Sequence, residues 1–175
     1  MSRVPDCNAP LKQFARRQFS HWQGLVADCT RADLDALFPR DDDWIGTGML
    51  GEGEYDYIWL SSSGYENPVR AWLDGERLAL LEVESPALAN PTRLLSALGE
   101  PDARLDAYRY TVLVTAGEWV YARRGLTLFV YPTENYIYHL AVYAPCSVAE
   151  YEHNLRPDLK VTRLSLRRQA SGMDS

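Results

Sequence analysis

One pattern occurs twice in this chain: a short leucine-rich helical segment is followed by several stretches in which apolar and polar residues alternate. The first copy begins with LDALFPRD at Leu34, and the second begins with LSALGEPD at Leu95. Alternation with a period of two predicts β-strands, and Asp74-Gly75 predicts a hairpin turn because glycine supplies the positive φ that such a turn needs. Because one such unit cannot bury both faces of its sheet, we expect the two units to lie side by side.

The two units predict an α+β fold, a curved antiparallel sheet with the helices on one face and an extra helix at the N-terminus. We expect a single domain over residues 1–168, with pseudo-repeats at about 30–86 and 91–145, and a disordered tail over 169–175. Capping signals place the helices at residues 11–25, 30–38, 90–98 and 147–155. The strands are expected at residues 55–61, 69–73, 78–84, 104–115, 119–123, 126–131, 136–143 and 161–166.

The composition is that of a globular protein. Hydrophobic residues make up 46% of the chain, and the mean hydropathy is −0.31, which is ordinary for a packed domain. No apolar run approaches the roughly 20 residues that span a bilayer, and the first residues lack the apolar stretch of a secretory signal. Lysine is rare among the eighteen basic residues, a bias that favours a GC-rich bacterial genome. We therefore expect a cytoplasmic bacterial protein that does not contact membranes.

The three cysteines are Cys7, Cys29 and Cys146. Their number is odd, they are widely separated, and none belongs to a CxxC pair. This spacing argues against both a disulfide framework and a structural zinc site. We expect reduced thiols, as in a reducing compartment.

The net charge of −6 is unevenly distributed, since residues 28–106 hold seventeen acidic residues against six arginines. An acidic surface of this kind repels nucleic acid and favours a basic protein partner through long-range steering. The alternative is an acidic surface that only aids solubility. Arg163, Arg167 and Arg168 form a basic cluster that would suit nucleic acid, but the overall sign of the charge opposes that function.

The segment from Gly46 to Gly51 matches the dinucleotide-binding pattern GxGxxG. That chemistry needs a strand before the glycines and a helix N-terminus after them, so that backbone N–H groups meet phosphate. Here acidic residues flank the glycines on both sides and no helical period follows. The segment is therefore predicted to be a flexible acidic loop.

A metal site could be imagined from His139, Cys146, Glu150 and His153. Glu150-x-x-His153 would place two side chains on one helix face, as in di-iron bundles, but those bundles use the motif twice and it occurs once here. We interpret these four residues as unrelated polar groups. No cofactor or metal is expected.

Nucleophilic catalysis has no better candidate. The serines of residues 61–64 lack the GxSxG elbow, and no group is positioned by the sequence to activate Cys146. Glu82 and Glu84 share one face of a strand, which glycosidase chemistry or a partner-facing surface could use. The sequence thus predicts a protein that is not an enzyme.

Strand alternation separates an aliphatic face from a face that carries rings and charges. In residues 126–131 three aliphatic side chains point one way, while Thr127, Phe129 and Tyr131 point the other. We expect helices on the aliphatic face and a protein partner on the other, because large rings bury much area with little loss of rotamer freedom. The alternative is that these rings fill a second core layer. The predicted partner-binding residues are Arg70, Trp72, Glu82, Glu84, Phe129, Tyr131, Tyr136, Tyr138, Asp41, Asp42 and Asp43.

The repeated helix followed by a strand meander, as in LSALGEPD at Leu95, resembles the tandem α/β units of β-lactamase inhibitory protein and of the outer-membrane assembly lipoprotein module. The resemblance covers about residues 30–145. It implies a concave sheet whose open face grips a protein partner. We expect the chain to depart from those proteins, because its sequence predicts no signal peptide, no lipidated cysteine and none of the disulfides of the inhibitor.

Together these features predict a cytoplasmic protein-binding module, most concretely a bacterial immunity protein that neutralises a toxin by occluding it. The alternative is a small-molecule-binding or hydrolytic domain that uses the concave sheet face as a pocket. A closed cavity with a carboxylate of raised pKa would favour that alternative.

Overall fold

The computed structural model describes residues 6–61, 65–109 and 112–158, and for residues 40–44 it describes the backbone alone. The strand expected at 161–166, the tail at 169–175, the basic cluster of Arg163, Arg167 and Arg168, and residues 62–64 lie outside these ranges.

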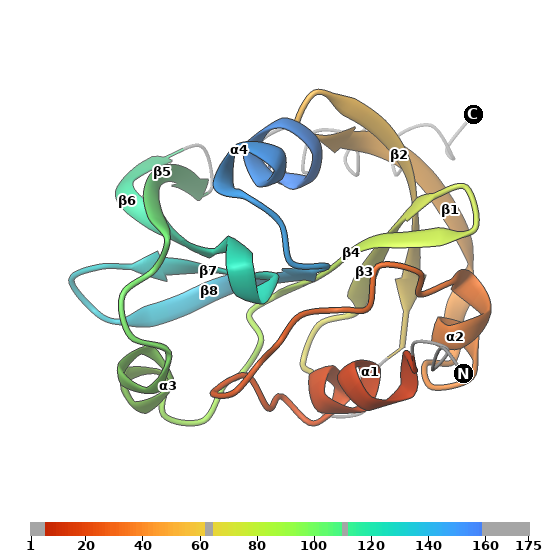
Figure 1. The fold of residues 1–175 in the computed structure, drawn as a ribbon, viewed down its shortest axis with the longest axis horizontal. Coiled ribbons are helices and arrows are strands. Elements are labelled where there is room, and N and C mark those ends of the chain that lie inside the picture. Colours follow the sequence, from red (N-terminus) through yellow and green to blue (C-terminus); the bar gives the residue numbers. More distant parts are fainter. Residues whose placement is uncertain (1–5, 62–64, 110–111, 159–175) are drawn as a thin grey trace, which may run out of the picture.

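Within the described ranges, eight strands form one open antiparallel sheet in the order β1-β2-β3-β4-β8-β7-β6-β5 (Figure 1). β4 pairs with β8, so two runs of four consecutive strands meet at the middle of the sheet. The predicted α+β class with an antiparallel sheet is confirmed. The strands are β1 (Arg40–Leu50), β2 (Gly53–Leu60), β3 (Val69–Asp74), β4 (Arg77–Glu84), β5 (Ala103–Arg109), β6 (Val112–Tyr121), β7 (Leu126–Tyr131) and β8 (Tyr136–Tyr143).

Helices cover both faces of this sheet. In Figure 1, α1, α2 and α3 lie on one side and α4 lies on the other, so the expectation of helices on one face holds for the first three only. The helices are α1 (Asn8–Ala15), α2 (Arg31–Asp35), α3 (Pro91–Leu98) and α4 (Val148–Glu150), which continues into the π-helical turn η2 (Tyr151–Leu155), and a 3-10 turn η1 (Ala122–Arg124) precedes β7.

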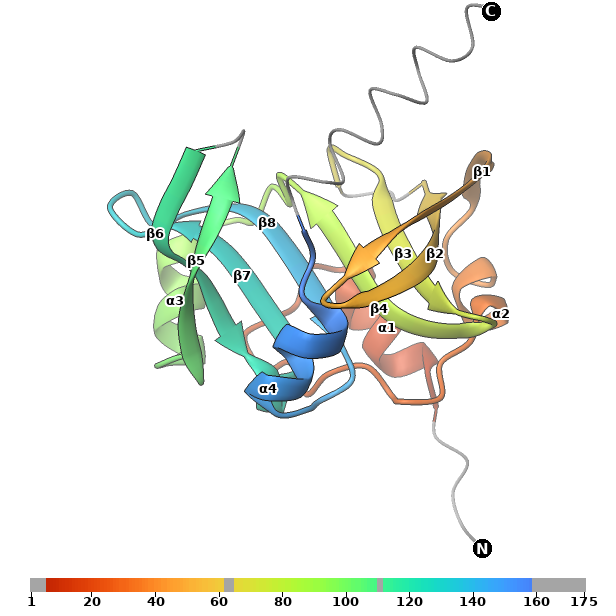
Figure 2. The ribbon, with the colours of Figure 1, turned by 90° about the horizontal axis from the view of Figure 1, so that it is seen from above.

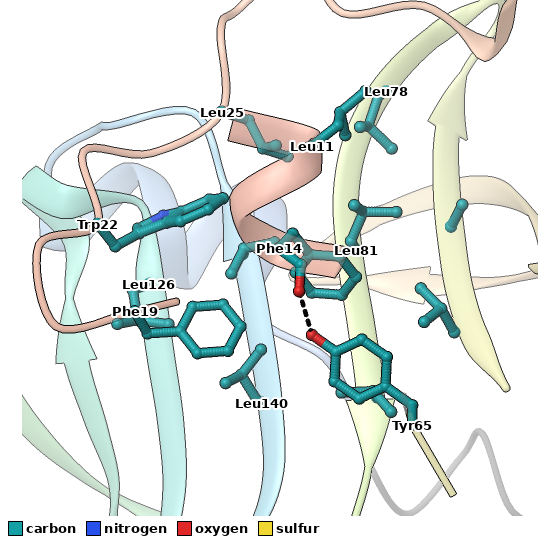
Figure 3. Close-up of a cluster of buried hydrophobic side chains, with 14 of the residues drawn as sticks. Leu11, Phe14, Phe19, Trp22, Leu25, Tyr65, Leu78, Leu81, Leu126 and Leu140 are labelled. Atoms are coloured by element: carbon teal, nitrogen blue, oxygen red, sulfur yellow. Dashed lines mark hydrogen bonds between the residues drawn. The ribbon is translucent and has the colours of Figure 1, made fainter. Parts of the chain in front are cut away.

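The first core lies between α1, α2, α3 and the aliphatic face of the sheet. Figure 3 shows the part of it around α1. Leu11 and Phe14 are three residues apart in α1, and this spacing places both on the buried side of the helix. The Tyr65 hydroxyl donates a hydrogen bond to the Phe14 carbonyl oxygen at 2.6 Å. The aliphatic residues of β3, β4, β7 and β8 complete this core. In β8 the predicted alternation is wrong, because Ile137 and Leu140 both belong to this core and Tyr138 and Ala141 to the other.

The first helix is shorter than the sequence predicts, because it ends at Ala15 instead of continuing to residue 25. Arg17 adopts a left-handed φ of 58°, which turns the chain out of the helix. Phe19, Trp22 and Leu25 are nevertheless buried in the first core. The Trp22 indole N–H donates to the Gly125 carbonyl oxygen at 3.1 Å. The predicted helix at residues 11–25 therefore contains core residues, but those after Ala15 are not helical.

The second core lies on the opposite face, beneath α4 and η2 (Figure 2). Tyr151 of η2 is fully buried and stacks on Tyr143 of β8, with ring centroids 5.0 Å apart. Trp72, Phe129 and Tyr138 belong to the same cluster. Figure 2 shows α4 lying between the β1–β2 end and the β5–β6 end of the curved sheet.

The glycine-rich segment is part of strand β1 and its turn into β2, so the prediction of a flexible loop is wrong. A Cβ atom at Gly48 would lie 2.9 Å from the Trp72 ring, and one at Gly46 would overlap the Tyr57 ring. The two glycines let these rings pack directly on the backbone of an edge strand. Gly51 then turns the chain with a φ of 54° into another strand and not into a helix, so the segment lacks the geometry of a dinucleotide-binding loop.

Cys7 and Cys29 form a disulfide with Cα atoms 5.6 Å apart, which corrects the prediction of reduced thiols. The bond ties the start of α1 to the segment that precedes α2. Cys146 is a free, half-buried thiol. An odd number of cysteines does not exclude a disulfide, because one unpaired thiol does not prevent the other two from pairing.

In the described part of the chain, no helix combines the length and the apolar character that crossing a membrane requires.

Candidate functional site

The ring-bearing face that the sequence assigned to a partner is mostly a second core layer. The exposed fractions of Trp72, Phe129 and Tyr138 are 1%, 1% and 4%. Arg70 and Glu82 are buried as well. The expectation that these five residues form an open surface is therefore wrong. The curvature of the sheet, the turn η2 and the glycines of β1 enclose them, and none of these features is visible in the alternation of a single strand.

The other predicted partner-binding residues have different environments. Glu84 and Tyr136 are exposed, and Tyr131 is half-buried. Asp41, Asp42 and Asp43 lie in β1, and their side chains are outside the described part of the structure. Only Glu84, Tyr131 and Tyr136 thus remain candidates for contact with a partner among those whose side chains are described.

Arg70, Glu82 and His139 form a buried ion cluster across three neighbouring strands. Arg70 Nη1 lies 2.8 Å from Glu82 Oε1, and His139 Nε2 lies 3.0 Å from Glu82 Oε2. Burial alone would raise the pKa of Glu82, but the charges of Arg70 and His139 outweigh it and lower the pKa to about 2. A carboxylate with so low a pKa is a poor proton acceptor near neutral pH. The cluster therefore suits a structural role better than acid–base catalysis.

Aromatic rings surround the guanidinium of this cluster. The Arg70 Cζ atom lies 4.4 Å from the Trp59 ring centroid and 5.1 Å from that of Tyr57. Such contacts stabilise a buried cation by about 1–2 kcal/mol when water is excluded. Arg70 is thus held by a carboxylate on one side and by rings on the other.

Glu118 of β6 is a second buried carboxylate, which the sequence argument missed. Arg156 Nε and the Tyr151 hydroxyl donate hydrogen bonds to it at 2.9 Å and 2.6 Å. Burial raises the pKa of Glu118 above its ordinary value, although Arg156 and Tyr151 oppose this shift. Glu118 lines a cleft of about 340 Å³, the Glu118 cleft, together with Glu52, Asp106, Phe129, Glu152 and Arg156.

The residues considered for a metal site are not brought together. His139 contacts Glu82, whereas His153 lies 3.4 Å from Glu52 on the surface. Glu150 accepts a hydrogen bond from the backbone N–H of Ser147 and caps α4. Among the described residues, no group of three or more possible ligands is positioned to hold a metal ion.

Cys146 is a poor candidate nucleophile. Burial raises the pKa of its thiol to about 11, and the nearby Glu150 carboxylate contributes to this shift. The thiolate is the reactive form, so a raised pKa lowers reactivity at neutral pH.

Four exposed apolar side chains lie near the end of the β5–β6 hairpin and at the start of β8, with Tyr108 and Leu113 on one face of the hairpin and Val112 on the other. Val112 is 63% exposed and Leu113 is 49% exposed, and Leu113 pairs with Tyr108 across the hairpin. The Arg109 guanidinium lies over the Tyr136 ring, with Cζ 5.6 Å from its centroid, and so joins this hairpin to β8. We call Tyr108, Val112, Leu113 and Tyr136 the hairpin patch.

Tyr136 was among the predicted partner-binding residues, whereas Tyr108, Val112 and Leu113 were not, because residues 104–115 were predicted to form one continuous strand. The structure divides this segment between β5, which ends at Arg109, and β6, which begins at Val112. The apolar residues near the division therefore lie at an exposed hairpin end and not in the middle of a strand.

Exposed carboxylates lie along much of the first meander and its neighbouring segments. They include Asp28, Glu52, Glu54, Asp56, Glu66, Asp74, Glu76, Glu84, Glu100 and Asp106. The acidic excess of residues 28–106 is thus largely a surface property.

Comparison with known proteins found no matching family, no matching curated protein and no matching solved structure. The resemblance to β-lactamase inhibitory protein and the outer-membrane assembly module stays a prediction.

Proposed function

We propose that the chain is a protein-binding module that contacts its partner through the hairpin patch. The observation that carries this proposal is the exposure of four large apolar side chains near the end of the β5–β6 hairpin and at the start of β8. Contiguous exposed apolar groups are typical of interaction sites, and tyrosines are favoured there because they combine a large ring with a polar tip. Tyr131 and Arg109 border the patch and extend it towards β7.

The partner is proposed to carry a basic surface. The net charge of −6 and the exposed carboxylates of residues 28–106 support this choice, because complementary charge speeds the encounter of two proteins. The concrete version is a bacterial immunity protein that occludes a toxin. In this proposal the two runs of strands, each preceded by a short helix, are tandem units that place the hairpin patch at the outer end of the second unit.

The location of the protein is part of the same proposal. A cytoplasmic immunity protein would meet a toxin inside the producing cell. The Cys7–Cys29 disulfide favours an oxidising compartment instead, since glutathione keeps most cytosolic thiols reduced. Alkylation of free thiols in intact cells, followed by mass spectrometry, distinguishes the two locations.

The test of the hairpin patch uses matched substitutions at the two ends of the sheet. A partner is first identified by cross-linked pull-down from the native host, and its affinity is then measured by calorimetry. We expect Leu113→Asp and Tyr136→Ala each to weaken binding by about tenfold or more, because each removes an exposed apolar anchor. Ile45→Asp is the control, since Ile45 is a 58% exposed apolar residue of β1, and its affinity should stay within about twofold of the wild type.

Equal losses of affinity in Ile45→Asp and Leu113→Asp would show that the added negative charge, and not the hairpin patch, determines the change in binding. Unchanged affinity in both Leu113→Asp and Tyr136→Ala would show that the hairpin patch is not the partner-binding surface. Alanine variants of Trp72 or Tyr138 are unsuitable probes because both side chains are buried.

A second candidate, a hydrolytic or small-molecule-binding domain, is favoured by the Glu118 cleft. Its buried carboxylate of raised pKa is the feature expected of a general acid or base. This candidate predicts hydrolysis of p-nitrophenyl acetate that falls about a hundredfold in Glu118→Gln. Glu52→Gln should retain it, since Glu52 is an exposed residue of the same cleft. Equal rates in all three proteins, matching the buffer alone, would remove this candidate.

A further inference from the structure

A cleft larger than the Glu118 cleft lies between the segment that follows α1 and the segment that leads into α3. Its volume is about 650 Å³. Figure 1 shows these two segments, and a hydrogen bond from Arg17 Nη1 to the Ala87 carbonyl oxygen, at 2.8 Å, links them. We call this the arginine cleft, because Arg16, Arg17 and Arg93 line it together with His21.

The charge of the arginine cleft is opposite in sign to that of the chain. No aspartate or glutamate lines it, although the whole chain carries a net charge of −6. Within the described residues, Arg16, Arg17 and Arg93 form no ion pair with a carboxylate. Five arginines elsewhere each form one, and these are Arg70, Arg77, Arg104, Arg123 and Arg156. The cleft therefore concentrates positive charge that no carboxylate in the described part of the chain pairs with.

The backbone around the arginine cleft is held in an unusual conformation. Arg17, Ala87 and Asn90 have left-handed φ values of 58°, 48° and 54°. Such values cost of order 1 kcal/mol or more for arginine and alanine, whereas asparagine tolerates them, and strained residues cluster at functional sites. Arg17 and Asn90 line the cleft directly, and the carbonyl oxygen of Ala87 accepts the hydrogen bond that links its two segments.

We propose that the arginine cleft binds a small organic anion, in which a carboxylate or phosphate is attached to an apolar group. Guanidinium groups bind these oxyanions through paired hydrogen bonds, and the cleft is lined by Arg16 from the end of α1 and by Arg93 from α3. Phe19, Leu88 and Leu94 supply an apolar lining for the rest of the ligand. The volume lies within the range of roughly 300–1,000 Å³ that is usual for ligand pockets. This site is separate from the hairpin patch and does not depend on the proposed function.

The test is calorimetric titration of the wild-type chain with phenyl phosphate, benzoate and inorganic phosphate. We expect phenyl phosphate or benzoate to saturate one site, and to bind about tenfold more tightly than inorganic phosphate because the ring contacts the apolar lining. The tighter of the two ring compounds identifies the preferred oxyanion. Arg16→Gln and Arg93→Gln should each weaken this binding by about tenfold. Arg77→Gln is the matched control, since Arg77 is exposed, lies on β4 and does not line the cleft.

Nuclear magnetic resonance of the wild-type protein gives an independent readout that needs no variant. Phenyl phosphate should shift amide signals of residues 16–21 and 88–97. The proposal is overturned by the absence of saturable binding, by shifts confined to other regions, by equal affinity for inorganic phosphate, or by an equal loss in Arg77→Gln.

Discussion

Replacing Glu82 with glutamine is expected to lower the free energy of unfolding by about 3–5 kcal/mol at pH 7. Glutamine has nearly the same shape but no charge, so Arg70 would be left buried without its counter-ion. Urea denaturation followed by tryptophan fluorescence measures the change. Glu84→Gln is the matched control, because Glu84 is an exposed residue of the same strand. Its effect should stay within about 0.5 kcal/mol.

The effect of Glu82→Gln should also depend on pH in a defined direction. The folded pKa of Glu82 is lowered to about 2 from an ordinary 4.5. A lowered pKa stabilises the fold above the unfolded value, and this contribution is lost as the pH falls from about 4.5 towards 2. The difference between wild type and Glu82→Gln should therefore shrink between pH 5 and pH 3. A difference that stays constant would contradict a charged Glu82 in the folded state.

A double variant separates the charge of the ion cluster from its packing. Arg70→Met combined with Glu82→Leu removes both members of the Arg70–Glu82 ion pair, keeps His139, and retains apolar volume in the second core. Replacing a buried pair in this way is often neutral or stabilising, whereas removing one partner is not. The double variant should thus be more stable than Glu82→Gln alone. A double variant less stable than Glu82→Gln would contradict this expectation. It would show that the contacts of the Arg70 guanidinium with the surrounding rings stabilise the fold more than a simple ion pair does.

The central strands could be predicted from the sequence because their cause is local. The alternation in residues 69–73, 78–84, 126–131 and 136–143 matches β3, β4, β7 and β8 to within a residue or two. β1 could not be predicted in this way. Its aspartates and glycines have low strand propensity, and the reason for Gly48 is the Trp72 ring, which belongs to another strand.

In the candidate site, too, the face on which a side chain lies has a local cause, whereas its burial and its partners depend on tertiary contacts. Alternation grouped Trp72, Phe129 and Tyr138 on one face, but their burial depends on sheet curvature and on η2, which comes much later in the chain. Glu118 carries no local signal at all, because its partners Tyr151 and Arg156 are 33 and 38 residues away. Partners so distant are found only when the chain is folded.

Removing the Cys7–Cys29 disulfide is expected to lower the free energy of unfolding by about 3 kcal/mol. The bond closes a loop with a sequence separation of 22 residues, and the entropy that such a loop loses in the unfolded chain sets this magnitude. The corresponding fall in Tm is about 6–12 °C for a domain of this size. Calorimetry of the wild type with and without dithiothreitol, and of Cys7→Ala, measures both quantities.

Cys146→Ala is the control for the disulfide, because it makes the same chemical change at a free thiol. Its effect should be about 1 kcal/mol or less, and dithiothreitol should destabilise this variant as much as the wild type. Cys7→Ala should be insensitive to dithiothreitol, since it has already lost the bond. If dithiothreitol leaves the Tm of the wild type unchanged, the two thiols are reduced in solution, as the sequence alone predicted, and the tie between α1 and the segment before α2 is made by packing.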